Sequence, residues 1–108
     1  PRLRRVDGSV VSLDATGQPP LGLFAGQRHT EASIDLDAGD VLLLYTDGLT
    51  EAKDAQGELF GEARLDDVLT AADDDPDSVA DAVLQAVGEF SDCAVPDDDR
   101  TLLVASMP

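Results

Sequence analysis

The sequence predicts an α+β fold in which antiparallel β-strands are flanked by helices. Three observations predict it: strand-like segments bounded by turns fill the first half, two segments with helical periodicity follow, and a strand-like segment closes the chain. Strands that precede two helices and a last strand favour a sheet covered by helices on one face. A chain of 108 residues can bury one modest core, so it is a single domain or a piece of one.

The first predicted element is a β-hairpin over residues 3–13. Its centre is the pair Asp7-Gly8, which supplies the positive φ angles of a tight turn. Residues 31–36 alternate polar and apolar side chains, which predicts a half-buried strand. Residues 41–45 are apolar at every position, so we expect a central strand that is covered on both faces and is the deepest element.

Two amphipathic helices are predicted next. Apolar residues at positions i, i+3, i+4 and i+7 within residues 65–72 indicate a short first helix. The second helix is expected to begin at Pro76, because proline at the first helical position needs no donor and the aspartates at 73–75 can accept hydrogen bonds from free helical amides. Its apolar stripe within residues 79–90 should lie on the sheet. Residues 101–107 predict the last strand.

The composition is strongly acidic. Seven Lys and Arg residues against 23 Asp and Glu residues give a formal net charge of −16, which disfavours nucleic acid and anionic membrane surfaces as partners. The longest continuous apolar run, residues 41–45, is far too short to cross a bilayer. Cys93 is the only cysteine, so no internal disulfide can form, and we interpret it as a small buried or half-buried residue. A cytoplasmic location is therefore predicted.

Two acidic segments carry the candidate chemistry. Asp47 and Gly48 directly follow the apolar strand, so a rigid element could present this carboxylate to a cleft. Residues 97–99 are three adjacent aspartates before the last strand, and they repel one another unless they are solvated or share a cation. If the two strands are neighbours, Asp47 and either Asp98 or Asp99 can converge on a divalent cation. Oxygen ligands of this kind suit Mg²⁺ or Mn²⁺.

Each acidic segment alone also has a simpler interpretation. Asp-Gly pairs often end strands as ordinary turns, and acidic runs are usually solvated loops. The sequence contains no EF-hand spacing, zinc pattern, P-loop or Rossmann glycine motif. The only histidine, His29, lies in a polar stretch that predicts a surface loop rather than a catalytic base. Cys93 lies beside acidic residues and is not predicted to be a nucleophile.

The sequence motifs resemble those of one protein family. Residues 39–65, GDVLLLYTDGLTEAKDAQGELFGEARL, are similar to the signature of bacterial PPM-type phosphatases of the SpoIIE/RsbU-like group. Residues 98–104, DDRTLLV, resemble the closing metal motif and last strand of that group, and residues 17–24, GQPPLGLF, resemble the segment before its paired strands. The resemblance covers nearly the whole chain. It implies a PP2C-like β-sandwich, in which two packed antiparallel sheets are flanked by helices.

The resemblance implies metal-dependent hydrolysis of phosphoserine or phosphothreonine on a regulatory protein. Asp47 and Asp98 match metal-ligand positions of a two-metal site that holds Mn²⁺ or Mg²⁺, and neither acts as a catalytic acid or base. Gly48 would let the backbone approach the metal cluster closely. Asp99 and Thr101 would support the loop that carries the second ligand.

The motifs of the family's first half, Asp-x-x-Gly-His-Gly and Asn-Ala-Gly-His, do not occur in this chain. Residues 1–108 are therefore expected to be the C-terminal portion of a SpoIIE-like phosphatase domain, with little or no activity alone. The start at Pro1 favours an excised or processed fragment. Substrates of this group are often anti-sigma-factor antagonists, so the resemblance implies a role in bacterial stress or developmental signalling. Free sheet edges would also favour a homodimer.

Two other hypotheses remain open. The chain could be a non-catalytic protein-interaction module, derived from a phosphatase domain, that binds a regulatory partner through a sheet edge or an acidic face. An upstream coding sequence with intact first-half motifs would favour the phosphatase instead. The chain could also be a small acidic α+β domain without this chemistry, and then Asp47→Ala in the full-length protein would leave phosphatase activity unchanged.

Overall fold

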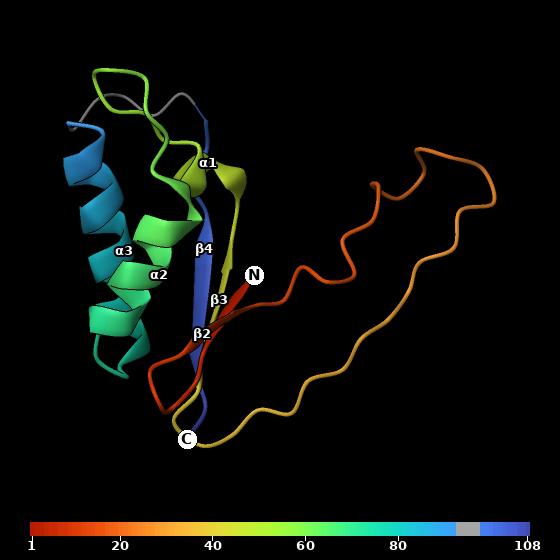
Figure 1. The fold of residues 1–108 in the computed structure, drawn as a ribbon, viewed down its shortest axis with the longest axis horizontal. Helices are drawn as coiled ribbons and strands as arrows, with labels where there is room; N and C mark the ends of the chain where they lie inside the picture. The colour runs from red at the N-terminus through yellow and green to blue at the C-terminus, as the bar shows by residue number, and fades with distance from the viewer. Residues whose placement is uncertain (93–97) are drawn as a thin grey trace.

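The computed structural model describes residues 1–92 and 98–108. Figure 1 shows one sheet with helices α2 and α3 on the same face, which confirms the predicted α+β architecture. The strands are β1 (Arg2–Arg4), β2 (Val10–Ser12), β3 (Val41–Tyr45) and β4 (Leu102–Ser106). The helices are α1 (Asp47–Thr50), α2 (Gly61–Ala71) and α3 (Pro76–Phe90).

The sheet is antiparallel, with the strand order β2-β1-β3-β4. Strands β1 and β2 are the arms of the predicted hairpin, and Gly8 turns it with a φ of 88°. Strand β3 pairs with β4 along its whole length, from Val41 opposite Ser106 to Tyr45 opposite Leu102. The prediction of a central strand at 41–45 is therefore confirmed, and the end of β3 lies beside the start of β4.

The described residues cover only one face of β3, so the prediction of burial on both faces is wrong for residues 1–92 and 98–108. Val41 and Leu43 are fully buried because they belong to the core that α2 and α3 complete. Leu44 lies on the opposite face and is 40% exposed, and Leu103, its partner on β4, is 55% exposed. The described residues supply no second layer over this outer face.

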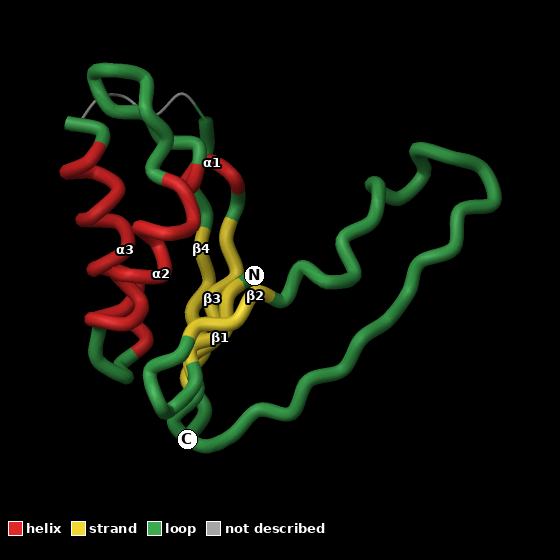
Figure 2. The backbone as a smooth tube through the Cα atoms, in the orientation of Figure 1, coloured by secondary structure: helices red, strands yellow, loops and turns green. Residues whose placement is uncertain are grey.

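The predicted strand at residues 31–36 is not formed, and the structure has no regular secondary structure there. Figure 2 shows this segment as part of a long loop that leaves the sheet after β2 and returns at β3. In the described part of the chain the sheet ends at β2 and β4, and the alternating segment pairs with neither of these edge strands. Ile34 and Leu36 are consequently 41% and 40% exposed.

Helix α3 begins where the sequence predicts. The Asp75 side chain caps it by accepting the Ser78 N–H at 2.9 Å, and Pro76 occupies the first turn. The inner stripe of the helix is fully buried in the core and consists of Val79, Val83 and Val87. None of the helices in the described ranges combines the length and the apolar character that crossing a bilayer requires.

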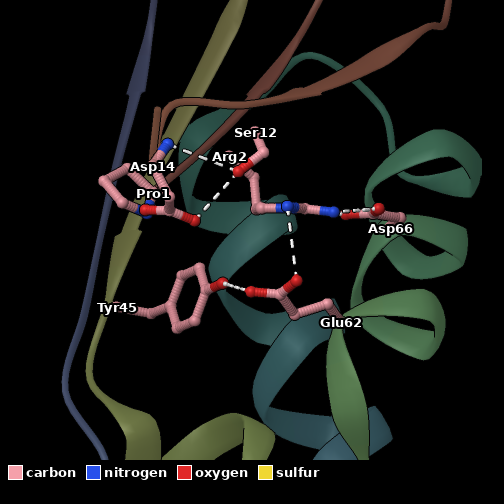
Figure 3. Close-up of polar contacts among 7 residues, drawn as sticks. All are labelled: Pro1, Arg2, Ser12, Asp14, Tyr45, Glu62 and Asp66. Carbon is pink, nitrogen blue, oxygen red and sulfur yellow. Dashed lines mark hydrogen bonds and ion pairs between the residues drawn. The ribbon is translucent and has the colours of Figure 1, made fainter. Parts of the chain in front are cut away.

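Arginines of β1 fasten the sheet to α2, a role that the sequence did not reveal. The Arg2 side chain donates two hydrogen bonds to the Asp66 carboxylate and lies 3.6 Å from a Glu62 carboxylate oxygen, as Figure 3 shows. These hydrogen bonds raise the pKa of the Arg2 guanidinium. Arg4 donates to two carbonyl oxygens at the C-terminal end of α2, each at 2.7 Å, where helical carbonyls lack partners. Both arginines are buried.

Candidate metal centre

The candidate site lies at the end of the sheet where β3 stops and β4 begins, next to α1 (Figure 1). Thr46 joins the two segments there. Its N–H donates to the Thr101 carbonyl oxygen at 3.0 Å, and its hydroxyl oxygen accepts the Thr101 N–H at 3.1 Å. The same hydroxyl lies 3.3 Å from the Asp99 carbonyl oxygen. Because Asp47 follows Thr46 and Asp98 precedes Asp99, both predicted ligands lie at one edge of the sheet.

Gly48 is the residue at which the two segments approach most closely. A Cβ atom at this position would lie 2.1 Å from the Asp99 carbonyl oxygen and 2.9 Å from its carbonyl carbon. Non-bonded atoms do not approach each other so closely. Only glycine therefore lets the backbone of the closing loop, residues 98–101, pass here. Gly48 is buried, whereas Asp47 is exposed. The geometry shows a close approach of Gly48 to the backbone of Asp99, and the approach of Gly48 to a metal cluster stays a prediction.

The position of Asp47 is fixed by its neighbours on both sides. After it, the Glu51 N–H donates to the Asp47 carbonyl oxygen at 2.8 Å, and Leu49 is fully buried in the core. Before it, the Tyr45 hydroxyl donates to Glu62 of α2 at 3.3 Å (Figure 3). Burial, and then the nearby Glu62 carboxylate, raise the pKa of Tyr45 to about 12. The hydroxyl therefore stays protonated and remains a donor at neutral pH.

Two carboxylates on adjoining segments fit part of a site for a hard divalent cation, since such cations prefer oxygen ligands. Asp98 is exposed, and one of its carboxylate oxygens accepts the Asp99 N–H at 2.8 Å. Across residues 1–92 and 98–108 there is no group of three or more His, Cys, Asp or Glu side chains placed to hold a metal. The described residues therefore offer an incomplete ligand set.

Other residues that the sequence singled out stand apart from this site. His29 is exposed on the long loop, as predicted. Cys93 and Asp97 lie outside the described residues, so the expectations about them stay predictions. Sequence reasoning missed Thr46. A β-branched polar residue at the end of an apolar strand is a weak signal, and nothing in the sequence marks Thr101 as its partner.

Comparison with known proteins decides the family. The whole chain, residues 1–108, matches the family model described as Stage II sporulation protein E (SpoIIE). The chain belongs to the SpoIIE family. Protein IcfG from Synechocystis sp. is 33% identical over 97 residues, which make up 90% of this chain and 15% of that protein.

The fold agrees with a solved SpoIIE structure. The phosphatase domain of the cell fate determinant SpoIIE from Bacillus subtilis, presoaked with Mn, superposes with a TM-score of 0.73 at 22% sequence identity. The match covers 98% of this chain and 45% of that chain. The chain is thus a SpoIIE-family, PP2C-like phosphatase domain segment, and its four-stranded sheet with helices corresponds to part of that fold. It spans less than half of the solved domain and a smaller share of IcfG.

Proposed function

We propose that residues 1–108 form the C-terminal portion of a phosphatase domain whose parent protein hydrolyses phosphoserine or phosphothreonine on a regulatory protein. The observation that carries the proposal is the junction that brings Asp47 and Asp98 to one sheet edge. Membership of the SpoIIE family supports the reaction class. A phosphorylated anti-sigma-factor antagonist is the substrate that the resemblance favours.

In this proposal Asp47 and Asp98 are ligands to Mn²⁺ or Mg²⁺, and the remainder of the domain supplies the other ligands. Bound divalent cations of this kind lower the pKa of coordinated water and neutralise charge on phosphoryl oxygens. The residues of this chain position the carboxylates: Thr46 ties the two segments together and Gly48 allows their close approach. The solved relative was presoaked with Mn, which favours Mn²⁺ as the first ion to test.

Manganese-dependent hydrolysis of a phosphoserine peptide by the parent protein tests the proposal. Asp47→Asn and Asp98→Asn should each lower kcat/KM by more than about 100-fold, because each removes a charged ligand. Asp81→Asn is the matched control, since Asp81 is an exposed acid in the first half of α3, and α3 begins at the end of the molecule away from α1 and the site (Figure 1). Calorimetric Mn²⁺ binding should weaken in the same two variants without depending on turnover. Full activity and unchanged Mn²⁺ binding in both would refute the assignment.

A second candidate function is the non-catalytic interaction module. It is favoured by the open outer face of the sheet, where Leu44 and Leu103 are exposed in the described part of the chain. A parent protein that binds a phosphoprotein but shows no metal-stimulated hydrolysis would support this candidate over the phosphatase. In either case we expect residues 1–108 alone to show little or no turnover.

A further inference from the structure

The long loop between β2 and β3, residues 13–40, contains a strand-like segment without a partner strand. Residues 31–36 alternate polar and apolar side chains, yet they form no strand in this structure. The Arg5 side chain donates to the Asp35 carbonyl oxygen at 2.8 Å, and among residues 1–92 and 98–108 this is the one hydrogen bond to the backbone of the segment. Its large apolar side chains, Ile34 and Leu36, are exposed. The segment thus has the pattern of a half-buried strand but lacks the pairing.

A buried carboxylate fixes the segment beside the sheet. Asp40 directly precedes β3 and is fully buried. Its carboxylate accepts hydrogen bonds from the Arg5 side chain at 2.6 Å, from the Asp37 N–H at 2.9 Å and from the Val6 N–H at 3.1 Å. The Asp40 N–H in turn donates to the Asp37 carbonyl oxygen at 3.1 Å. The turn at residues 37–40 is therefore fastened to the β1–β2 hairpin, and it determines where the segment leaves the sheet.

The rest of the long loop also exposes apolar side chains. Leu21, Leu23 and Phe24 are 84%, 59% and 61% exposed. Figure 1 shows that the loop extends on the side of the sheet away from α2 and α3, which is the side of the outer face with Leu44. Loops of this length without secondary structure are uncommon in compact domains, and gathered apolar side chains mark contact surfaces. This side of the chain therefore has the character of an interface.

The remainder of the parent domain is the partner that fits this interface. The match to the solved SpoIIE phosphatase domain covers 98% of this chain, so it includes nearly all of the loop, but it covers only 45% of that chain. More than half of the solved domain thus has no counterpart in residues 1–108. A second copy of this chain fits less well, because each copy carries a formal net charge of −16 and the copies repel each other.

We propose that residues 31–36 form a β-strand in the parent protein by pairing with a strand from the remainder of the phosphatase domain. Pairing with an extended strand would satisfy the backbone N–H and C=O groups of the segment. Ile34 and Leu36 would then face an apolar layer, while Ser33 and Asp35 would lie on the opposite face. The inference rests on the proposal that this chain is part of a longer phosphatase domain, but it does not depend on hydrolysis.

Amide hydrogen exchange in the parent protein tests the pairing. A synthetic peptide of residues 29–38 gives the exchange rates of the unpaired segment. We expect the paired amides of residues 31–36 to exchange at least about tenfold more slowly in the parent protein than in the peptide, because strand amides exchange only when the structure opens. A smaller difference at every amide of the segment would overturn the proposal.

Two substitutions in the parent protein test which face of the segment is covered. Ile34→Asp places a charge on the apolar face and should speed exchange of the segment by about tenfold or more, because burying an unpaired charge is costly. Ser33→Asp is the matched control. It adds the same charge to the opposite face and should change the exchange rates by less than about threefold, as surface substitutions do. Equal effects, or a larger effect of Ser33→Asp, would overturn the proposal. If Ile34→Asp does not fold, exchange in the unsubstituted protein still decides.

The remaining outcomes identify the partner and separate this proposal from the phosphatase function. Slow exchange that is lost when the parent protein is diluted to a monomer would overturn the proposal, because a second copy would then supply the partner strand. Slow exchange in a monomeric parent protein without Mn²⁺-dependent hydrolysis would refute the phosphatase and leave the pairing standing. Fast exchange in an active parent protein would overturn the pairing and leave the phosphatase standing.

Discussion

Replacing Gly48 with alanine adds one carbon atom where α1 meets the loop that carries Asp98. The new Cβ would lie 2.1 Å from the Asp99 carbonyl oxygen, whereas ordinary contacts begin at 3.4 Å. The loop must therefore move by about 1.3 Å to accept the substitution. Because the obstructing atom belongs to the backbone, no side-chain rotation can relieve the clash. The displacement would carry Asp98 away from Asp47.

The expected effects of Gly48→Ala follow from that displacement. A misplacement of about 1 Å in a catalytic arrangement costs about 100-fold in rate, so kcat/KM of the parent protein should fall by about that factor. Overpacking costs about 1–3 kcal/mol, and the free energy of unfolding should fall by that amount. Manganese-dependent phosphopeptide hydrolysis and urea titration measure the two effects separately.

Gly88→Ala is the matched control for this prediction. Gly88 lies within α3, and apart from its chain neighbours and the nearby backbone of its own helix no described atom lies within 4 Å of the position that its Cβ would take. Alanine is the better helix former, so this variant should gain about 0.5–1 kcal/mol and keep its activity. If Gly48→Ala retained the activity and stability of the parent protein, the close approach of α1 and the closing loop would be wrong.

Three further predictions test the packing and electrostatics of the fold. Tyr45 is the only tyrosine, and its pKa is raised from 10.0 to about 12, so tyrosinate absorbance should rise near pH 12 in the folded chain. The contribution of the Tyr45 hydroxyl to the free energy of unfolding is therefore present below pH 10 and is lost as the pH rises toward 12. A midpoint near pH 10 would contradict the burial. Leu65→Ala should lower the free energy of unfolding by about 2–5 kcal/mol and Leu84→Ala by less than about 1 kcal/mol, since Leu65 is fully buried and Leu84 is 44% exposed; similar urea midpoints would contradict this. Hydrogen bonds from the Ser78 backbone and hydroxyl lower the pKa of Asp75 below 3.8. The ionised Asp75 cap therefore stabilises the folded state fully above pH 3.8, and this stabilisation is lost as the pH falls through the lowered pKa. Asp75→Asn should make thermal stability less dependent on pH in that range, and an unchanged dependence would refute the cap.

Signals from residues close together in sequence predicted most of the fold. The turn at Asp7-Gly8 and the start of α3 at Pro76 depend on a few adjacent residues, and both are confirmed. The strand at residues 31–36 failed because alternation shows which side chains share a face but not whether a partner strand exists. The expected cover on both faces of β3 failed for a related reason. An apolar strand needs a cover, but its sequence does not say that the same chain provides one.

The candidate site was predictable only in its residue types. Carboxylates at a strand end and in an acidic run could be found by reading the sequence, and their role as metal ligands stays a prediction. The bond between Thr46 and Thr101 could not be found, since it joins residues 55 positions apart. The arginines of β1 show the same limit. Their sequence indicates only a basic cluster, whereas in the structure Arg2 and Arg4 hold the sheet against α2.

Two features that the described residues leave incomplete, the ligand set and the cover of the sheet, lie next to each other. Leu44 and Leu103 are paired on the outer face of the sheet, which the described residues leave open. They lie near the end of β3 and the start of β4, and Asp47 and Asp98 lie just beyond this end of the two strands. A second layer that covered these leucines would end beside the two carboxylates. Apolar burial would hold that layer in place, and oxygen ligands carried at its edge would complete the coordination of the cation. In the proposed phosphatase domain, stability of the sandwich and affinity for the metal therefore depend on the same contact between layers.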